Sequence, residues 1–181
     1  MDKKVLRLAS PLQEDSFVDG PGIRMVLWTQ GCPHHCPNCH NPQTWDLNGG
    51  TYYPVEEICK QIRESQLQSG LTLSGGEPFL QSEALLDVVK EAKHKKLNIW
   101  AYSGYTFEEI IANEKKKELL SYVDVLVDGR YVEAERDYRL VFKGSFNQRI
   151  IDVQKSLACG YVVLSEKDEQ NQKLRRDTVN G

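Results

Sequence analysis

Long apolar runs are missing from this sequence of 181 residues. No stretch approaches the ~18 consecutive apolar residues that a membrane-spanning helix needs. The N-terminal residues Met1-Asp2-Lys3-Lys4 lead into a mixed stretch and not into the apolar core of a signal peptide. The sequence therefore predicts no membrane association and a location in the cytoplasm.

An excess of charge of one sign is also missing. The chain carries 23 Lys and Arg against 26 Asp and Glu, a net charge of −3, and this balance predicts no bulk attraction to nucleic acid. Its 40% hydrophobic content is enough for a folded core. No repeat or internal linker interrupts the chain. We expect a single domain over residues 1–165, followed by a polar C-terminal tail over residues 166–181.

Cysteine is scarce, and its number is odd. Three of the five cysteines lie within eight residues, at Cys32, Cys36 and Cys39, while Cys59 and Cys159 stand alone. Thiols stay reduced in the cytoplasm. An odd, clustered set therefore argues against a disulfide framework and for a metal site or catalysis. We expect the two isolated cysteines to pack in the core.

Strand-like and helix-like segments alternate along the chain. Strands are predicted over residues 4–8, 23–29, 70–74, 97–102, 123–127, 139–143 and 161–164. Helices are predicted over 54–68, over 82–95, after Thr106, and after the capping-box spacing of Ser145 and Gln148. The alternation predicts βαβ units and a mostly parallel sheet. Because a complete βα barrel needs ~250 residues, we expect an α/β fold with a partial, open barrel of about five to six βα units.

Four loops follow predicted strands, and each carries chemically distinctive residues. They are the cysteine loop over 31–42, Gly75-Gly76-Glu77, Ser103-Gly104 and Asp128-Gly129. Ligands of such folds bind at the carboxyl ends of the strands. We therefore expect these loops to converge on one rim.

The cysteine loop has the spacing Cys, three residues, Cys, two residues, Cys. Thiolate is the ligand that iron–sulfur clusters use. A structural metal site uses protein ligands at every position, whereas a catalytic site leaves one position open. Three cysteines on a four-iron cube would leave one iron free to bind an exogenous ligand.

A zinc site is the alternative interpretation of the same loop. His34, His35 or His40 would then be the fourth ligand, and the chain would be a non-enzymatic zinc-binding interaction module. Structural zinc sites usually draw their ligands from two separated knuckles, and no second pair of cysteines or histidines follows in this sequence.

Five sequence strings carry a resemblance to a known family. They are Gly31–Pro42 (GCPHHCPNCHNP), Asp19–Arg24 (DGPGIR), Leu73–Pro78 (LSGGEP), and the pair Val125–Gly129 (VLVDG) and Gly144–Arg149 (GSFNQR). The first resembles the cluster loop of radical S-adenosylmethionine enzymes, and the set is similar to the glycyl-radical-enzyme activases. In particular it resembles the anaerobic ribonucleoside-triphosphate reductase activating proteins. The likeness covers about residues 15–155.

The resemblance implies an oxidoreductase. Cys32, Cys36 and Cys39 would be the catalytic residues and the ligands of a 4Fe-4S cluster, whose open iron would bind S-adenosyl-L-methionine. Reductive cleavage would yield a 5′-deoxyadenosyl radical, which would take hydrogen from a glycine of an anaerobic (class III) ribonucleoside-triphosphate reductase. The electron donor would be a flavodoxin or ferredoxin. The alternative partner is another glycyl radical enzyme, such as pyruvate formate-lyase.

The resemblance also assigns positions to cofactor binding, and these are Asn38, Cys39, His40, Gly75, Gly76, Glu77, Ser103, Gly104 and Asp128. The glycine pair would let backbone approach the methionyl part, and Glu77 would accept from its ammonium group. Asp128, with Arg130, would help to bind a monovalent cation or to shape the surroundings of the cofactor. The glycine pair and Asp128 can also belong to plain turns, and Ser103-Gly104 can be a helix cap.

The segment before the cluster strand is the candidate partner-binding region. In the resemblance, Asp19, Gly20 and Arg24 would grip the glycine loop of the partner enzyme. A turn explains Gly20-Pro21-Gly22, but it leaves the charged residues on either side unexplained.

Overall fold

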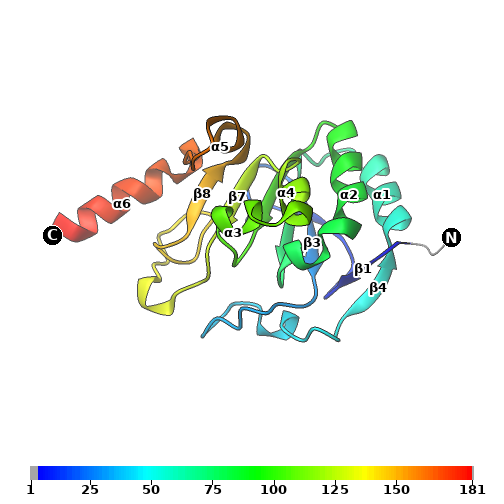
Figure 1. The fold of residues 1–181 in the computed structure, drawn as a ribbon, viewed down its shortest axis with the longest axis horizontal. Coiled ribbons are helices and arrows are strands. Elements are labelled where there is room, and N and C mark those ends of the chain that lie inside the picture. Colours follow the sequence, from blue (N-terminus) through cyan, green and yellow to red (C-terminus); the bar gives the residue numbers. More distant parts are fainter. Residues whose placement is uncertain (1–3, 181) are drawn as a thin grey trace.

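Residues 4–180, which the structure describes, form one sheet of eight strands covered by helices in this computed structural model (Figure 1). The strands are β1 (Val5–Leu8), β2 (Gln13–Ser16), β3 (Arg24–Thr29), β4 (Thr51–Pro54), β5 (Gly70–Gly75), β6 (Asn98–Tyr102), β7 (Val125–Asp128) and β8 (Arg149–Asp152). The helices are α1 (Val55–Glu64), α2 (Ser82–His94), α3 (Phe107–Ile111), α4 (Glu114–Leu120), α5 (Val153–Cys159) and α6 (Glu169–Asn180). The strand order is β4-β1-β3-β5-β6-β7-β8, and β2 pairs with β3 beside this path.

The centre of the sheet is parallel. β3 pairs with β5, β5 with β6, and β6 with β7, all in the parallel sense. Parallel neighbours need crossover connections, and these contain α1, then α2, then α3 with α4. The strands on either side pair antiparallel. The predicted α/β fold is confirmed. Within residues 4–180, however, only four strands are parallel, which is fewer than five to six βα units require. The strands on both sides of this parallel centre run antiparallel to it instead.

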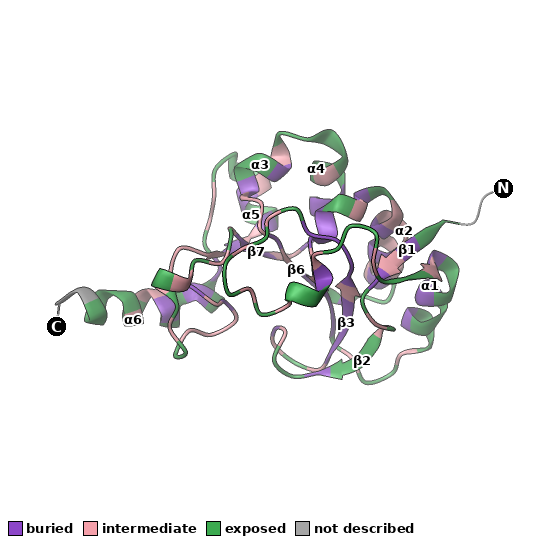
Figure 2. Ribbon diagram, turned by 90° about the horizontal axis from the view of Figure 1, so that it is seen from below, coloured by how far each residue is buried: buried purple, intermediate pink, exposed green. Residues whose placement is uncertain are grey.

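Hydrophobic residues at helical spacing hold α2 against the sheet. Leu85, Val88, Val89 and Ala92 are fully buried, and steps of three and four residues place them on one helix face. Figure 2 shows this division, with buried residues on the central strands and exposed residues on the outer faces of the helices. Among the described residues, no helix has the length and apolar character that crossing a bilayer requires.

The helix predicted after Thr106 is confirmed as α3, and it begins with a capping box. The Glu109 backbone N–H donates to the Thr106 hydroxyl at 3.2 Å, and the Thr106 N–H donates to the Glu109 carboxylate at 2.8 Å. The similar spacing at Ser145 and Gln148 does not begin a helix. The Gln148 side-chain oxygen accepts instead from the Gly144 N–H at 2.8 Å and closes a loop.

Three predictions for the C-terminal third of the chain are wrong. Residues 139–143 form no strand, because Asp137 starts a turn and Phe142 has a φ of 60° that a strand cannot adopt. Residues 161–164 contribute one isolated bridge, between Leu164 and Ile151. Cys159 is exposed and not in the core, whereas Cys59 is buried there as predicted.

The segment predicted as a polar tail is polar but regular. Residues Glu166–Asp168 form a 3-10 turn, η4, and α6 follows directly. Figure 1 shows α6, in red, extending away from the sheet. The turn is capped because the Ser165 hydroxyl accepts from the Lys167 N–H at 3.2 Å. Gly181 lies outside the described residues.

Candidate functional site

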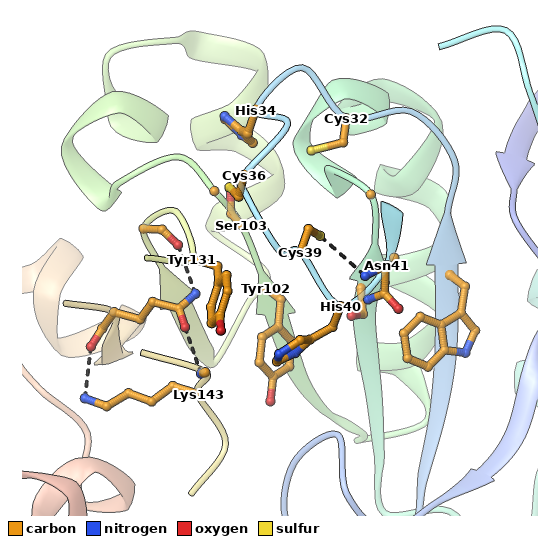
Figure 3. Close-up of a pocket in the computed structure, with 18 of the residues that line it drawn as sticks. Cys32, His34, Cys36, Cys39, His40, Asn41, Tyr102, Ser103, Tyr131 and Lys143 are labelled. Carbon is orange, nitrogen blue, oxygen red and sulfur yellow. Dashed lines mark hydrogen bonds between the residues drawn. The ribbon is translucent and has the colours of Figure 1, made fainter. Parts of the chain in front are cut away.

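A cavity of about 430 Å³ lies at the carboxyl ends of the parallel strands. The cysteine loop forms one wall, and the residues that follow β5, β6 and β7 form the others (Figure 3). Its strand-end lining comprises Gly75, Gly76, Ser103, Gly104 and Gly129. The carboxyl ends of parallel strands meet at one edge, and the structure brings these loops together as the sequence predicts.

The three clustered cysteines all line this cavity. Cys32 is buried, and Cys36 and Cys39 are half-buried. Burial raises the pKa of the Cys32 thiol and of the Cys36 thiol, so both favour the neutral form until a cation ionises them. Within residues 4–180, no three side chains of Cys, His, Asp or Glu converge on one point as they would around a single metal ion.

Tight turns and backbone bonds shape the cysteine loop. His35 and Asn38 adopt left-handed φ angles of 47° and 58°, and the Cys39 N–H donates to the Cys36 carbonyl at 3.1 Å. The loop is tied at its base, where the Cys32 N–H donates to the Trp45 carbonyl at 3.2 Å. These bonds shape the backbone of the loop, and Figure 3 shows Cys32, Cys36 and Cys39 along it at the cavity.

Glu77 is fully buried, and its carboxylate is already engaged by protein donors. It lies 2.9 Å from the His34 ring nitrogen, and it accepts from the Ser103 hydroxyl and from the Gly104 N–H, each at 2.9 Å. It also accepts from the Phe79 N–H at 3.0 Å. A carboxylate has about four lone-pair sites, so these protein donors engage Glu77 and make it a link between loops.

Close packing against neighbouring backbone and against one side chain accounts for the glycines of the rim. A Cβ on Gly75 would lie 2.5 Å from the backbone of Thr29, and one on Gly76 would lie 2.4 Å from the Gly31 carbonyl oxygen. A Cβ on Gly104 would lie 2.3 Å from the His34 ring. These residues must be glycine for the loops to approach one another, whether or not a ligand is bound.

Asp128, which the sequence assigns to cofactor or cation binding, is not among the residues that line the cavity. Its carboxylate is 1% exposed, accepts from the Phe107 N–H at 2.7 Å and pairs with Arg149 at 2.5 Å. It therefore fixes the start of α3, and its neighbour Gly129 lines the cavity instead. Arg130 is exposed.

The three expected partner-binding residues differ from one another in their surroundings. Asp19 lines the cavity and accepts from the Ser16 hydroxyl at 2.5 Å, while Gly20 is buried with a φ of 130°. Arg24 is also buried, and its guanidinium donates to the Thr72 hydroxyl at 2.7 Å and to two backbone carbonyls at 2.9 Å. Arg24 thus holds the preceding turn against the sheet, and it also donates to the Pro21 carbonyl at 3.1 Å.

Several lining residues were not singled out in the sequence. Tyr102, Tyr131 and Lys143 all contribute to the cavity. Tyr102 is the last residue of β6, so its place at a strand end was a signal. Lys143 carried no such signal, because its segment reads as a strand. Figure 3 shows Tyr131 and His40 on the same side of the cavity, and their ring centroids are 5.0 Å apart.

Comparison with known proteins shows which family this chain resembles in sequence. A family model described as "4Fe-4S single cluster domain" matches residues 18–151. The chain is 39% identical over 141 residues to a protein of Enterobacteria phage T4, covering 74% of this chain and 86% of that protein. Identity is 37% to a protein of Vibrio cholerae and 34% to one of Escherichia coli K12, each covered to 90%. All three are named "Anaerobic ribonucleoside-triphosphate reductase-activating protein".

The similarity to a solved structure is weaker than the similarity to these relatives. QueE from Escherichia coli aligns with a TM-score of 0.45 and 14% sequence identity, covering 68% of this chain and 70% of that chain. This level of similarity supports no conclusion about function.

The residues of the cavity fit a 4Fe-4S cluster. Three thiols, the ligand type of such clusters, come from one loop and share one wall. The other two cysteines lie elsewhere, Cys59 in the core and Cys159 on the surface. The cysteines therefore supply three ligands for four irons. One iron would be left without a cysteine ligand.

Proposed function

The chain belongs to the family of anaerobic ribonucleoside-triphosphate reductase-activating proteins, and on that premise we propose that it activates such a reductase by radical chemistry. The observation that carries the proposal is the cavity in which three thiols face the strand-end loops. When bound and reduced, a 4Fe-4S cluster would supply the electron that cleaves S-adenosyl-L-methionine to methionine and a 5′-deoxyadenosyl radical. That radical would take a hydrogen atom from a glycine of the reductase and leave a glycyl radical.

The chain contributes ligands, orientation and shelter from water. Cys32, Cys36 and Cys39 would hold the cluster, and the half-buried wall would keep water from it. Hydrogen bonds, charge and solvent exposure set the potential of such clusters. A flavodoxin or ferredoxin would supply the electron.

S-adenosyl-L-methionine would occupy the space between the cysteine loop and the strand ends. A volume of about 430 Å³ lies within the usual range for small-molecule sites, ~300–1,000 Å³. The proposed contacts are the backbone and side chains of Asn38, Cys39, His40, Gly75, Gly76, Ser103 and Gly104. Glu77 would act indirectly, by holding the Ser103-Gly104 turn and His34 in place.

The glycine loop of the reductase would enter beside Asp19. The neighbouring residues Phe17 and Val18 are 70% and 78% exposed, and Val18 also lines the cavity. An open mouth with exposed apolar side chains suits a protein partner that covers it. We also propose that the open sheet is a partial βα barrel of radical SAM type, since its four parallel strands end at this one cavity.

A partner-resolved radical assay tests the function. The chain is reconstituted anaerobically with iron and sulfide, reduced, and mixed with S-adenosyl-L-methionine and either the anaerobic reductase or pyruvate formate-lyase. Paramagnetic resonance should then detect a glycine-centred radical on the reductase. A radical on the lyase alone would contradict the assignment, as would a colourless protein that retains one zinc and stays inert after reconstitution.

A further inference from the structure

A buried indole N–H beside the cysteine loop has no acceptor. Trp45 follows the short 3-10 turn η1 (Pro42–Thr44), and its side chain lines the same cavity as the three cysteines. Its Nε1 atom is shielded from solvent and has no hydrogen-bond partner among residues 4–180. A buried donor left unpaired is costly, and most buried polar groups have a partner. We therefore expect an acceptor that the described chain does not itself supply.

The position of Trp45 is fixed from two sides. Its carbonyl accepts from the Cys32 N–H at 3.2 Å, and its own backbone N–H donates to the Pro42 carbonyl at 3.2 Å. Its ring stacks on His35, with centroids 4.8 Å apart and an angle of 11° between the planes. These contacts tie both the backbone and the indole ring of Trp45 to the cysteine loop.

Trp28 provides an internal comparison. It lines the same cavity, but its indole N–H donates to the Gln13 side-chain oxygen at 2.9 Å. One tryptophan of the cavity is thus satisfied by the chain, and the other is not. The difference lies in the surroundings, because both are indole donors in one site.

We propose that the Trp45 indole N–H donates a hydrogen bond to a sulfide of the bound iron–sulfur cluster. The inference rests on the proposed function, because the cluster supplies the acceptor. Hydrogen bonds to sulfur help to set the reduction potential of iron–sulfur clusters. The reduced cluster is more negative and accepts more strongly, so this donor raises the potential. Trp45 would thereby make the cluster easier to reduce.

The test is a redox titration of three full-length proteins: wild type, Trp45→Phe and Trp28→Phe. Each is reconstituted anaerobically, and its reduced cluster is followed by paramagnetic resonance. In Trp45→Phe the ratio of reduced to oxidised cluster at a fixed potential should fall about fivefold, the effect of one ordinary hydrogen bond. Trp28→Phe should titrate like the wild type. Equal potentials in all three proteins would overturn the proposal, and would be the outcome if water were the acceptor.

A second variant keeps the test decisive if Trp45→Phe assembles no cluster. Benzothienylalanine, incorporated at position 45 alone, keeps the shape of the indole but has sulfur in place of the N–H. Electron–nuclear double resonance of the reduced wild type should show an exchangeable proton coupled to the cluster, and this coupling should vanish in the isostere. A coupling that persists, or is absent from the wild type, would overturn the inference alone. A wild type that assembles no cluster would overturn the proposed function as well.

Discussion

At the scale of single residues, Glu77 acts through the protein around it. Its buried carboxylate joins three segments: the cysteine loop through His34, the turn after β6 through Ser103, and its own 3-10 turn through the Phe79 N–H. A buried carboxylate is tolerated only when its oxygens are bonded. The site walls are therefore held in register by this one side chain.

Replacing Glu77 should destabilise the fold markedly. Glu77→Ala leaves the His34 ring and the Ser103 hydroxyl without their buried acceptor, and we expect a loss of about 3 kcal/mol in the free energy of unfolding. Chemical denaturation measures it. The control is Glu83→Ala, which removes an exposed pair with Lys115 and should cost under ~1 kcal/mol. Similar losses in both variants would contradict the role given to Glu77.

The predictability of the site residues follows from where their partners lie. The three cysteines are close in the sequence, so their shared chemistry can be recognised without a structure. Arg24 and Asp128 could not be placed in this way. Their partners, Thr72 and Arg149, are 48 and 21 residues away, and only the folded sheet brings them together.

At the scale of elements, Arg149 ties β8 to its neighbours. Its guanidinium pairs with Asp128 of β7 at 2.5 Å and with Glu108 of α3 at 2.8 Å. The hydrogen bond from Arg149 lowers the pKa of the Glu108 carboxyl below its ordinary 4.5. The start of α3 is thus held over the antiparallel edge of the sheet.

The contribution of Glu108 should depend on pH. Because its folded pKa lies below its unfolded value, the contribution is present above pH 4.5 and is lost as the pH falls through the folded pKa. The carboxylate is more than half exposed, so Glu108→Gln should cost less than ~1 kcal/mol at pH 7. In strongly acid solution the variant and the wild type should be equally stable by urea denaturation. A deficit independent of pH would exclude the ion pair as its cause.

Elements, like residues, could be predicted from the sequence only where a local pattern specifies them. The helix α2 is predictable because its apolar residues repeat at helical spacing over thirteen residues. The error over residues 139–143, where a strand was predicted, could not be foreseen. Apolar composition does not reveal the left-handed φ of Phe142 or the turn that begins at Asp137. The capping-box spacing at Ser145 and Gln148 predicted a helix that does not form, because the Gln148 side chain accepts from the Gly144 N–H and closes a loop instead.

At the scale of the whole molecule, a buried ion pair joins the C-terminal segment to the site. The Lys143 ammonium lies 2.8 Å from the Asp168 carboxylate, and both side chains are 1% exposed. Lys143 also donates to the Gln148 carbonyl at 2.9 Å, and it lines the cavity. The segment after residue 165 is therefore coupled to the cavity wall.

This pair should be strongly non-additive. Asp168→Leu or Lys143→Met leaves one buried charge unpaired, and each should cost about 3 kcal/mol in the free energy of unfolding. The double variant removes both charges, so it should cost much less than the sum. Denaturation of the four proteins completes the cycle. Losses that simply add would show that the two groups do not interact.

The arrangement of the whole sheet explains why the site was predictable while its surroundings were not. Parallel strands place their carboxyl ends together, so loops after β5, β6 and β7 had to share a rim with the cysteines. The antiparallel strands β1, β4 and β8 follow from pairings between distant segments, which no local pattern specifies.

The central claim is that Cys32, Cys36 and Cys39 together carry the chemistry. The most direct measurement is the yield of 5′-deoxyadenosine from S-adenosyl-L-methionine under anaerobic reduction, with each of these cysteines replaced in turn by alanine. We predict no product above background in any of the three, and the wild-type yield in Cys159→Ala, whose thiol is exposed on α5. Undiminished product from any one of the three variants would contradict the account.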